Sequence, residues 1–265
     1  MPYLEHGKRR LYYEEDGEGP AILLVHSFFC SADMWRYQVP ALAESHRVIN
    51  VDLRGHGRSS PVRKSIDLYT LVEDTLALLD HLGVEQAIWA GLSVGGMTAM
   101  RAALVSPERV RAVILLDTDA DAERSWFKMK NRPMGAGTRL LGLRPFLPAI
   151  VKAMFGPTTC RENPQLVEEW RGRFGAADVE SMRHYLEALI RRDSVAPRLG
   201  EIRVPALVVV GAEDRALPPS ISKRIDAGLP DSTLVEIPHA GHLCTLEQPE
   251  AVTAAMPEFL TRRVG

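Results

Sequence analysis

The sequence predicts an α/β protein with a doubly wound, mostly parallel sheet and a group of helices inserted late in that sheet. Two observations predict this fold class. Short apolar runs alternate with helical patterns over most of the 265 residues, which is typical of parallel strands joined by crossover helices. The alternation then stops between about residues 120 and 197, where helical patterns follow one another without strand-like runs.

The elements can be predicted in order along the chain. Alternating polar and apolar residues at 10–14 predict an edge strand or hairpin, and a cluster of turn-forming residues follows it. Buried strands are then predicted at residues 21–26, 48–52, 87–92, 110–116, 206–210 and 232–237. Helices are predicted between several of these strands, at residues 32–44, 68–82 and 97–105. Parallel neighbours require right-handed crossovers, which favours a doubly wound sheet.

The helical segment inserted at about residues 120–197 is predicted to form a cap. We expect a core domain formed by residues 1–119 and 198–265, and a helical cap, or lid, formed by residues 120–197. Helical segments are predicted in the cap at residues 147–155, 164–174 and 179–192. Such an insertion lies over the carboxyl edge of the strands, where the sites of α/β proteins are found. The alternative is a plain helical decoration of the sheet.

Composition excludes several classes of function. The chain is 46% hydrophobic and 25% charged, with a net charge of −2 and with acidic and basic residues interspersed. This balance indicates a globular protein that binds neither nucleic acid nor a membrane surface. The first residues show no secretory signal pattern, and no apolar run is long enough to span a bilayer. Three widely spaced cysteines favour neither disulfides nor zinc, so we expect a cytoplasmic location.

Ser93 is the candidate nucleophile. It lies in residues 91–96, Gly-Leu-Ser-Val-Gly-Gly, between an apolar run and a helix-forming stretch. A serine at a sharp strand-to-helix turn, with small residues that let strand and helix approach, is the context of a nucleophile elbow. The turn places the hydroxyl at a helix N-terminus, where backbone N–H groups favour negative charge. The alternative is a chance loop with this pattern.

The candidate acid is Asp214, which comes shortly after a buried strand. A serine hydroxyl needs a base, and the base needs an acidic group that orients it. The chain order of serine, acid and histidine is the one expected on this kind of sheet. Asp214 could instead cap or turn the chain before the following helix. Glu213 beside it, and Asp117 and Asp119 after the preceding strand, are alternative acids.

The candidate base is His242, in the loop after the last predicted strand. Gly241 gives the backbone there the freedom to direct an imidazole across the edge of the sheet. His239 is the alternative, although it lies closer to the strand. The remaining histidines outside the strands have no such setting, and we interpret them as surface or locally hydrogen-bonded residues: His6, His46, His56, His81 and His184.

Acyl transfer also needs donors for the oxyanion that develops on the substrate carbonyl. The N–H of Val94, which follows the nucleophile, is one predicted donor. The loop after an early strand supplies the second, for which we select the N–H of Phe28. Ser27 lies next to it, and its hydroxyl either adds a further donor or simply fits as a small side chain.

Taken together, these segments resemble the α/β-hydrolase superfamily over essentially the whole chain. Ser27 is a departure, since the family usually has glycine there. The final segment, residues 240–250, is similar to the 3-oxoadipate enol-lactonase branch and to related esterases and perhydrolases. The resemblance rests on residues 26–28 (His-Ser-Phe), 52–59 (Asp-Leu-Arg-Gly-His-Gly-Arg-Ser), 91–96, 211–214 (Gly-Ala-Glu-Asp) and 241–242 (Gly-His).

The residues and the resemblance together predict a serine hydrolase that cleaves a carboxylic ester or lactone. We expect it to need no cofactor or metal and to act on a small molecule; its oligomeric state is open. The same residues are also compatible with perhydrolysis, thioester or carbon–carbon bond hydrolysis, or with a ligand-binding protein that does not turn over substrate. The predicted pocket residues are Ser27, Phe29, Trp35, Met97 and Trp126.

Overall fold

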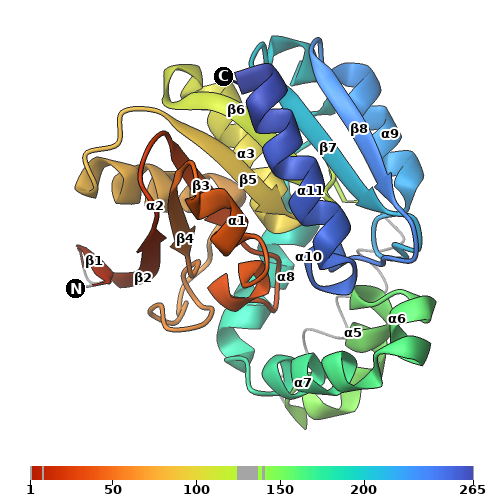
Figure 1. Ribbon diagram of the computed structural model, residues 1–265. Coiled ribbons are helices and arrows are strands. Elements are labelled where there is room, and N and C mark those ends of the chain that lie inside the picture. The colour runs from red at the N-terminus through yellow and green to blue at the C-terminus, as the bar shows by residue number, and fades with distance from the viewer. Residues whose placement is uncertain (1, 8, 124–136, 139–140, 265) are drawn as a thin grey trace.

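The computed structural model describes residues 2–7, 9–123, 137–138 and 141–264 (Figure 1). The strands within these ranges form one eight-stranded sheet in the order β1-β2-β4-β3-β5-β6-β7-β8. β1 pairs with β2, and β2 with β4, in antiparallel fashion, whereas all the other neighbours are parallel. The strands are β1 Tyr3–His6, β2 Arg9–Asp16, β3 Ala21–Val25, β4 Arg47–Val51, β5 Ala87–Leu92, β6 Val110–Leu116, β7 Ala206–Gly211 and β8 Ser232–Ile237. The predicted fold class is confirmed.

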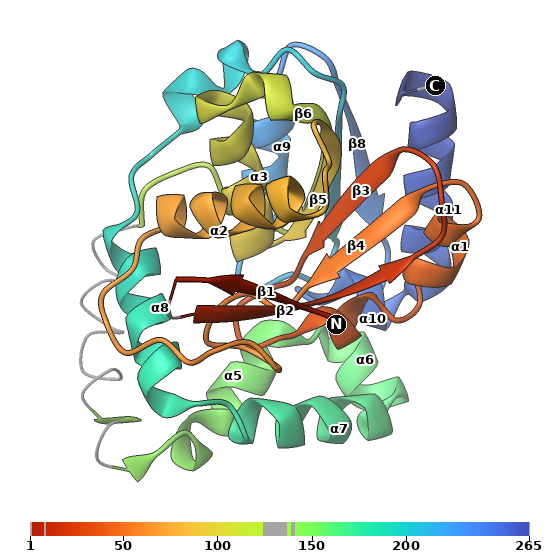
Figure 2. The same ribbon diagram turned by 90° about the vertical axis from the view of Figure 1, so that its left-hand side faces the viewer.

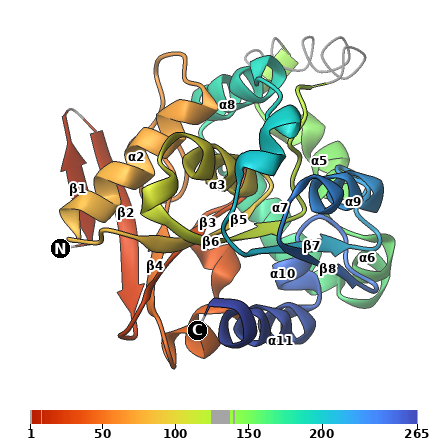
Figure 3. The ribbon, with the colours of Figure 1, turned by 90° about the horizontal axis from the view of Figure 1, so that it is seen from above.

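Successive residues of the central strands point to opposite faces of the sheet, so the protein has a core on each face. In β3, for example, Leu23 and Val25 belong to one buried cluster and Ile22 and Leu24 to the other. Helices α2 (Leu68–His81), α3 (Val94–Val105) and α9 (Pro219–Gly228) cover the first face, and α1 (Val39–Ala43) and α11 (Pro249–Phe259) cover the second (Figure 3). Strands buried on both faces explain why their sequences are continuous apolar runs.

The helix predicted over residues 32–44 is in fact two short pieces. A 3₁₀ turn, η1, covers Ala32–Trp35, and α1 begins only at Val39. Pro40 lies in the first turn of α1, where a missing N–H is harmless. In a continuous helix the ring of Pro40 would clash with the carbonyl of Arg36, so the chain breaks before it.

All the described elements between β6 and β7 are helical. They are η3 Arg144–Phe146, α5 Leu147–Met154, α6 Pro157–Glu162, α7 Pro164–Gly175, α8 Val179–Arg191 and η4 Ala196–Glu201. We call α5 to α8 the cap helices; Figures 1 and 2 show α5, α6 and α7 grouped at one end of the sheet. α6 was not predicted, whereas α5, α7 and α8 agree with prediction within a residue or so.

The remaining short elements are η2 (Pro107–Arg109), α10 (Cys244–Glu247) and a π-helical turn at Leu260–Val264. Within the described ranges, no helix combines the length and the apolar character needed to cross a membrane.

Candidate active site

Ser93 has a backbone conformation that an L-residue rarely adopts. It follows β5 directly, and its φ of 56° and ψ of −112° turn the chain sharply into α3. Such a conformation costs about 1–3 kcal/mol and persists only where the surroundings enforce it. A Cβ at Gly91 would overlap the backbone of Gly95, and a Cβ at Gly95 would overlap the carbonyl of Val25. The two glycines therefore allow the close approach of strand and helix that holds Ser93 at the turn.

Hydrogen bonds fix the peptide units on both sides of Ser93. Its N–H donates to the Leu116 carbonyl at 2.9 Å, which extends the pairing of β5 with β6. Its carbonyl accepts from the Met97 N–H at 2.9 Å and from the Thr118 hydroxyl at 2.7 Å. The side chain lies at the first turn of α3 with only 9% of its surface exposed, so the hydroxyl is held at a helix N-terminus.

Asp214 and His242 are brought together at the same edge of the sheet. The Nδ1 atom of His242 lies 2.8 Å from Oδ2 of Asp214, and both side chains are buried. A carboxylate accepts hydrogen bonds, so Nδ1 donates and Nε2 carries the lone pair that a general base requires. The other carboxylate oxygen of Asp214 accepts from the N–H groups of Ala216 and Leu217, at 2.8 and 3.0 Å. No hydrogen bond joins Ser93 to His242, both of which are described.

The alternative acids and the alternative base have other surroundings. Asp119 is paired with Arg192 at 3.0 Å. Glu213 accepts from both the N–H and the hydroxyl of Thr158, at 2.9 and 2.6 Å. The His239 side chain is 71% exposed. None of the three makes a hydrogen bond to His242, so the geometry favours Asp214 and His242.

Asp117 is fully buried at the end of β6. Its Oδ1 accepts from the Gly211 N–H at 2.8 Å. Burial, followed by the nearby charge of Asp214, raises the pKa of the Asp117 carboxyl well above its ordinary value. A carboxyl that retains its proton cannot stabilise an imidazolium as an anion does. Asp117 therefore differs from Asp214 in environment, although the two residues end neighbouring strands.

The peptide between Ser27 and Phe28 has a defined direction. The Ser27 carbonyl accepts from His26 Nδ1 at 2.7 Å and from the Cys30 N–H at 3.1 Å. Because the peptide is trans and planar, the Phe28 N–H points away from both donors. Three neighbouring N–H groups of the loop have acceptors: Ser27 donates to Met34 Sδ, Phe29 to His56 Nε2, and Cys30 to the Ser27 carbonyl.

The Phe28 N–H, in contrast, makes no hydrogen bond to the described part of the chain. The Val94 N–H opens α3, and the first N–H of a helix has no intrahelical acceptor. These are the two donors predicted from the sequence. Ser27 is fully buried, and its Oγ has no hydrogen-bond partner among the described residues.

Two buried histidines support this loop as neutral acceptors. His26 Nε2 accepts from the Leu53 N–H at 2.9 Å, and His56 Nε2 accepts from the Phe29 N–H at 3.3 Å. Burial lowers the pKa of both imidazoles, and for His56 the neighbouring His26 lowers it further. Neutral rings can each donate from Nδ1 and accept at Nε2. Both rings therefore fix the loop that carries the Phe28 N–H.

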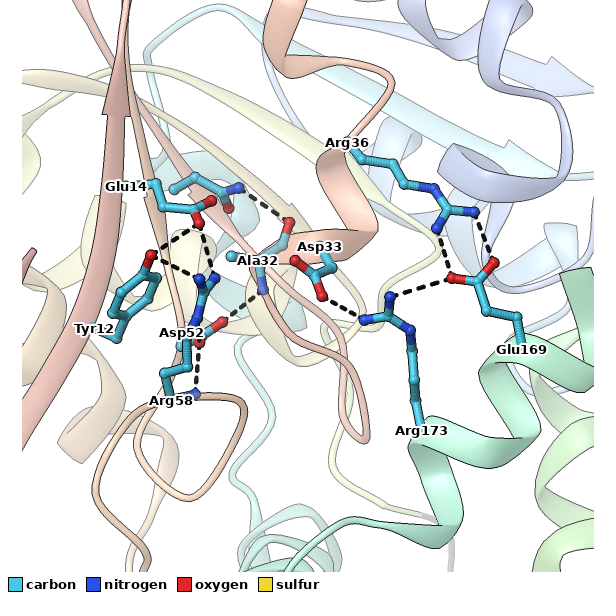
Figure 4. A network of polar contacts seen from close by, with 10 residues as sticks. Tyr12, Glu14, Ala32, Asp33, Arg36, Asp52, Arg58, Glu169 and Arg173 are labelled. Atoms are coloured by element: carbon cyan, nitrogen blue, oxygen red, sulfur yellow. Dashed lines mark hydrogen bonds and ion pairs between the residues drawn. The ribbon is translucent and has the colours of Figure 1, made fainter.

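Asp52 anchors the far end of the same loop, as Figure 4 shows. Its carboxylate is fully buried and accepts from the N–H groups of Ala32 and Arg58, at 2.7 and 2.8 Å. The Asn50 side chain donates to the Ala32 carbonyl at 3.0 Å. The segment from Asp52 to Arg58 carries no reacting group of the candidate site, but these contacts fix the loop that supplies Phe28.

Aromatic rings join the loop to the cap helices. The Phe28 ring stacks on Tyr185 of α8 with a centroid distance of 6.0 Å, and Phe29 lies edge-on to Phe174 of α7 at 6.1 Å. The Tyr185 hydroxyl donates to the Arg54 carbonyl at 2.8 Å. The cap helices therefore pack directly over the loop that supplies Phe28.

The predicted pocket residues fall into different parts of the structure. Phe29 is partly buried between the loop and the cap. Met97 is buried in the same cluster as Val94, and Trp35 is fully buried in the core on the other face of the sheet. Trp126 lies outside the described residues. Their contact with a substrate stays a prediction, as does that of Ser27.

Two carboxylates hold the cap against this site, and sequence reasoning did not foresee this role. Glu213, considered there only as an alternative acid, accepts from Thr158. Glu247 was not singled out; it is buried and accepts from the Gly156 N–H at 2.8 Å and the Leu243 N–H at 3.1 Å. Its only sequence signal is an acidic residue directly after residues 243–246, which does not identify its partners. In the described ranges, no group of three or more His, Cys, Asp or Glu side chains is arranged to hold a metal ion.

Comparison with known proteins finds similar sequences and structures over almost the whole chain. The family described as "alpha/beta hydrolase fold" matches residues 20–249. A protein of Azorhizobium caulinodans, provisionally named as a carbamate hydrolase, is 31% identical over 98% of each chain. The 3-oxoadipate enol-lactonase 2 of Acinetobacter baylyi is 30% identical over 92% of this chain and 89% of its own. The structure of a thermophilic esterase from Thermogutta terrifontis superimposes with a TM-score of 0.92 at 31% identity, covering 96% of this chain and 94% of that one.

The chain therefore belongs to the α/β-hydrolase family. Within that family, it stands with the branch that contains the enol-lactonases and esterases, as the sequence predicted.

Replacing Gly95 with Ala should destabilise the protein, because the new Cβ would overlap the Val25 carbonyl. Overpacking of this kind costs about 1–3 kcal/mol or more. Gly172 in α7 is the matched control: it is exposed, a Cβ there meets no atom within 4 Å, and Ala should stabilise the helix by up to about 1 kcal/mol. Urea unfolding of both variants measures the difference. Equal stability of Gly95→Ala and the wild type would contradict the enforced turn.

Replacing Asp117 with Asn should stabilise the protein increasingly as the pH rises. The folded protein holds the Asp117 proton more tightly than the unfolded chain does, so wild-type stability falls as the pH rises from the ordinary pKa of 3.8 toward the raised folded value. Asn removes this loss and keeps an oxygen for the Gly211 N–H. Thermal unfolding of both proteins at a series of pH values should show a Tm difference that grows in favour of the variant. A pH-independent difference would show that the Asp117 pKa is not raised.

Proposed function

We propose that this protein is a serine hydrolase that cleaves a carboxylic ester or lactone through an acyl-enzyme intermediate. The observation that carries the proposal is the 2.8 Å hydrogen bond between Asp214 and His242. It leaves Nε2 of His242 as a base at the edge of the sheet where Ser93 lies in its strained turn. A hydroxyl, an imidazole and a carboxylate in these environments are the groups that acyl transfer requires.

In the proposed reaction, Ser93 Oγ attacks the carbonyl carbon while Nε2 of His242 takes its proton. Asp214 keeps the imidazole in the tautomer that accepts at Nε2 and stabilises the imidazolium that forms. The imidazolium then protonates the leaving alkoxide, which departs and leaves an acyl group on Ser93. Water, deprotonated by His242, releases the acid in the second half of the reaction.

The oxyanion of each tetrahedral intermediate is assigned to the N–H groups of Phe28 and Val94. Two features support this assignment: neither N–H has an acceptor in the described protein, and both lie on rigid supports. Donors that are already oriented lower the barrier without reorganisation, and removing one such donor in other hydrolases costs about 10²–10³-fold in kcat.

We also propose that residues 120–197 form the cap that selects the substrate, with residues 1–119 and 198–265 as the catalytic core. The ring contacts of Tyr185 with Phe28 and of Phe174 with Phe29 support this division, because they place cap side chains beside the proposed oxyanion donor. The reaction uses only groups of this chain, without a cofactor. The three free cysteines are compatible with a cytoplasmic location.

Ser93→Ala should abolish ester hydrolysis without unfolding the protein. Loss of a triad nucleophile typically lowers kcat about a millionfold. The test combines nitrophenyl esters of graded acyl length, simple lactones, an enol-lactone and a carbamate with covalent labelling by a fluorophosphonate. Wild type should hydrolyse members of the panel and be labelled at Ser93, and the variant should do neither. Activity that survives in rigorously purified Ser93→Ala protein would overturn the assignment.

Asp214→Asn should lower kcat about 10⁴-fold, because the amide favours the wrong imidazole tautomer. Asp117→Asn is the matched control, since it makes the same chemical change at the end of the neighbouring strand and should retain most of the activity. Both variants are compared with the best ester of the panel. The reverse pattern, with Asp117→Asn inactive and Asp214→Asn active, would move the acid to β6.

A further inference from the structure

Glu247 is a buried carboxylate for which the proposed reaction has no use. It ends α10, five residues after His242, and only 8% of its surface is exposed. It makes no ion pair with Lys or Arg in the described part of the chain. A buried carboxylate without a cation is costly unless several donors surround it. The role of Glu247 can therefore be inferred from the parts of the chain that supply its hydrogen-bond donors.

The first group of donors flanks His242. Oε1 of Glu247 accepts from the Leu243 N–H at 3.1 Å, and this N–H is shared with the Met154 carbonyl at the same distance. The Gly241 N–H lies close enough to the same carboxylate to lower its pKa. The residues immediately before and after His242 thus both direct a backbone N–H toward Glu247.

The second group of donors comes from the cap. Oε2 accepts from the Gly156 N–H at 2.8 Å, and the Thr159 hydroxyl lies close enough to lower the pKa of the same carboxyl. Gly156 and Gly241 also touch through their backbones, since a Cβ at Gly241 would overlap Gly156. The start of α6 is thereby attached to the loop that carries His242.

The buried environment of the Glu247 carboxylate disfavours its negative charge. Burial raises the pKa of Glu247, and the neighbouring donor groups of Thr159, Gly156, Gly241 and Leu243 oppose that shift. These donor groups therefore favour the charged form of the carboxylate. Breaking this set removes both the orientation and the reason for the charge to be buried.

We propose that Glu247 is a positioning residue for His242, and that it fixes the imidazole by holding the N–H groups of Gly241 and Leu243. It acts through the backbone and does not touch the substrate. This inference rests on the proposed function insofar as His242 is the base, but the geometry of the Asp214–His242 pair can be measured without turnover. Misplacing a reacting group by about 1 Å can cost about 10²-fold in rate.

The test replaces Glu247 with Gln, which preserves size but leaves one oxygen for two sets of N–H donors. We expect kcat for an activated nitrophenyl ester to fall about 10²-fold with KM changed by less than about threefold, because the base acts in the transition state. The low-field NMR signal of the proton between His242 and Asp214 should also shift or broaden. Circular dichroism and Tm establish that the variant is folded; if it is not, Glu247→Asp, which keeps the charge on a shorter side chain, is tested in the same way.

Glu213→Gln and Thr159→Val are the matched controls. The first weakens the other carboxylate contact to α6, at Thr158, and the second removes the cap hydroxyl from Glu247 and leaves the loop N–H groups in place. Both should keep the low-field signal and a kcat within about threefold of wild type. If Glu247 merely attached the cap, all three variants would instead change KM alike.

The outcomes separate this inference from the proposed function. A Glu247→Gln protein with unchanged kcat and an unchanged low-field signal overturns the positioning role. Should wild type neither hydrolyse the panel nor react with a fluorophosphonate, while Glu247→Gln still disturbs the low-field signal, then the hydrolase proposal fails and the positioning role stands.

Discussion

The close approach of β3, β5 and α3 at two glycines is the constraint on which the site depends. Gly91 and Gly95 bring the strand and the helix into backbone contact, and Gly95 also lies against the carbonyl of Val25, the last residue of β3. The loop that begins after Val25 carries Phe28, and the helix that contains Gly95 begins after Ser93. One contact between backbones thus sets the distance between the candidate nucleophile and the candidate oxyanion donor.

Buried polar groups around this contact are almost all engaged in orienting backbone. Asp52, His26, His56 and Glu247 each receive N–H groups from the loops that carry the candidate site residues. Their burial costs free energy that their hydrogen bonds offset only when every partner is present. Carboxylates and neutral imidazoles therefore surround the candidate triad, and each of them holds particular N–H groups of the loops that carry it. That arrangement suits chemistry that requires sub-ångström placement.

The sequence predicted the parts of the protein that depend on local pattern. Six parallel strands and the turn at Ser93 follow from apolar runs and glycine spacing, because strands buried on both faces have nearly uniform composition. Asp117 and Asp214 both fit the chain order, so the choice of Asp214 rested on its place after the later buried strand; only the structure shows that His242 bonds to it. Glu247 and α6 could not be predicted, because their partners are distant in sequence and a six-residue helix carries little periodic signal. The roles of the cap side chains depend on packing that no spacing rule encodes.

The cap is attached to the core in two physically different ways, and the difference bears on how such a protein diverges. On α7, Arg173 pairs with Asp33 of η1, and Glu169 pairs with Arg36, which follows η1 (Figure 4); all four side chains are at least 31% exposed. Exposed pairs of this kind contribute about 0–1 kcal/mol each, so their loss or reversal is nearly neutral. On α6, the attachment is a backbone contact without room for a methyl group. Substitutions in these exposed pairs on the outer cap are therefore expected to cost little stability, whereas a side chain at Gly156 would displace the loop that carries His242. The outer surface of the cap can thus vary in sequence while the backbone beside the candidate base stays in place.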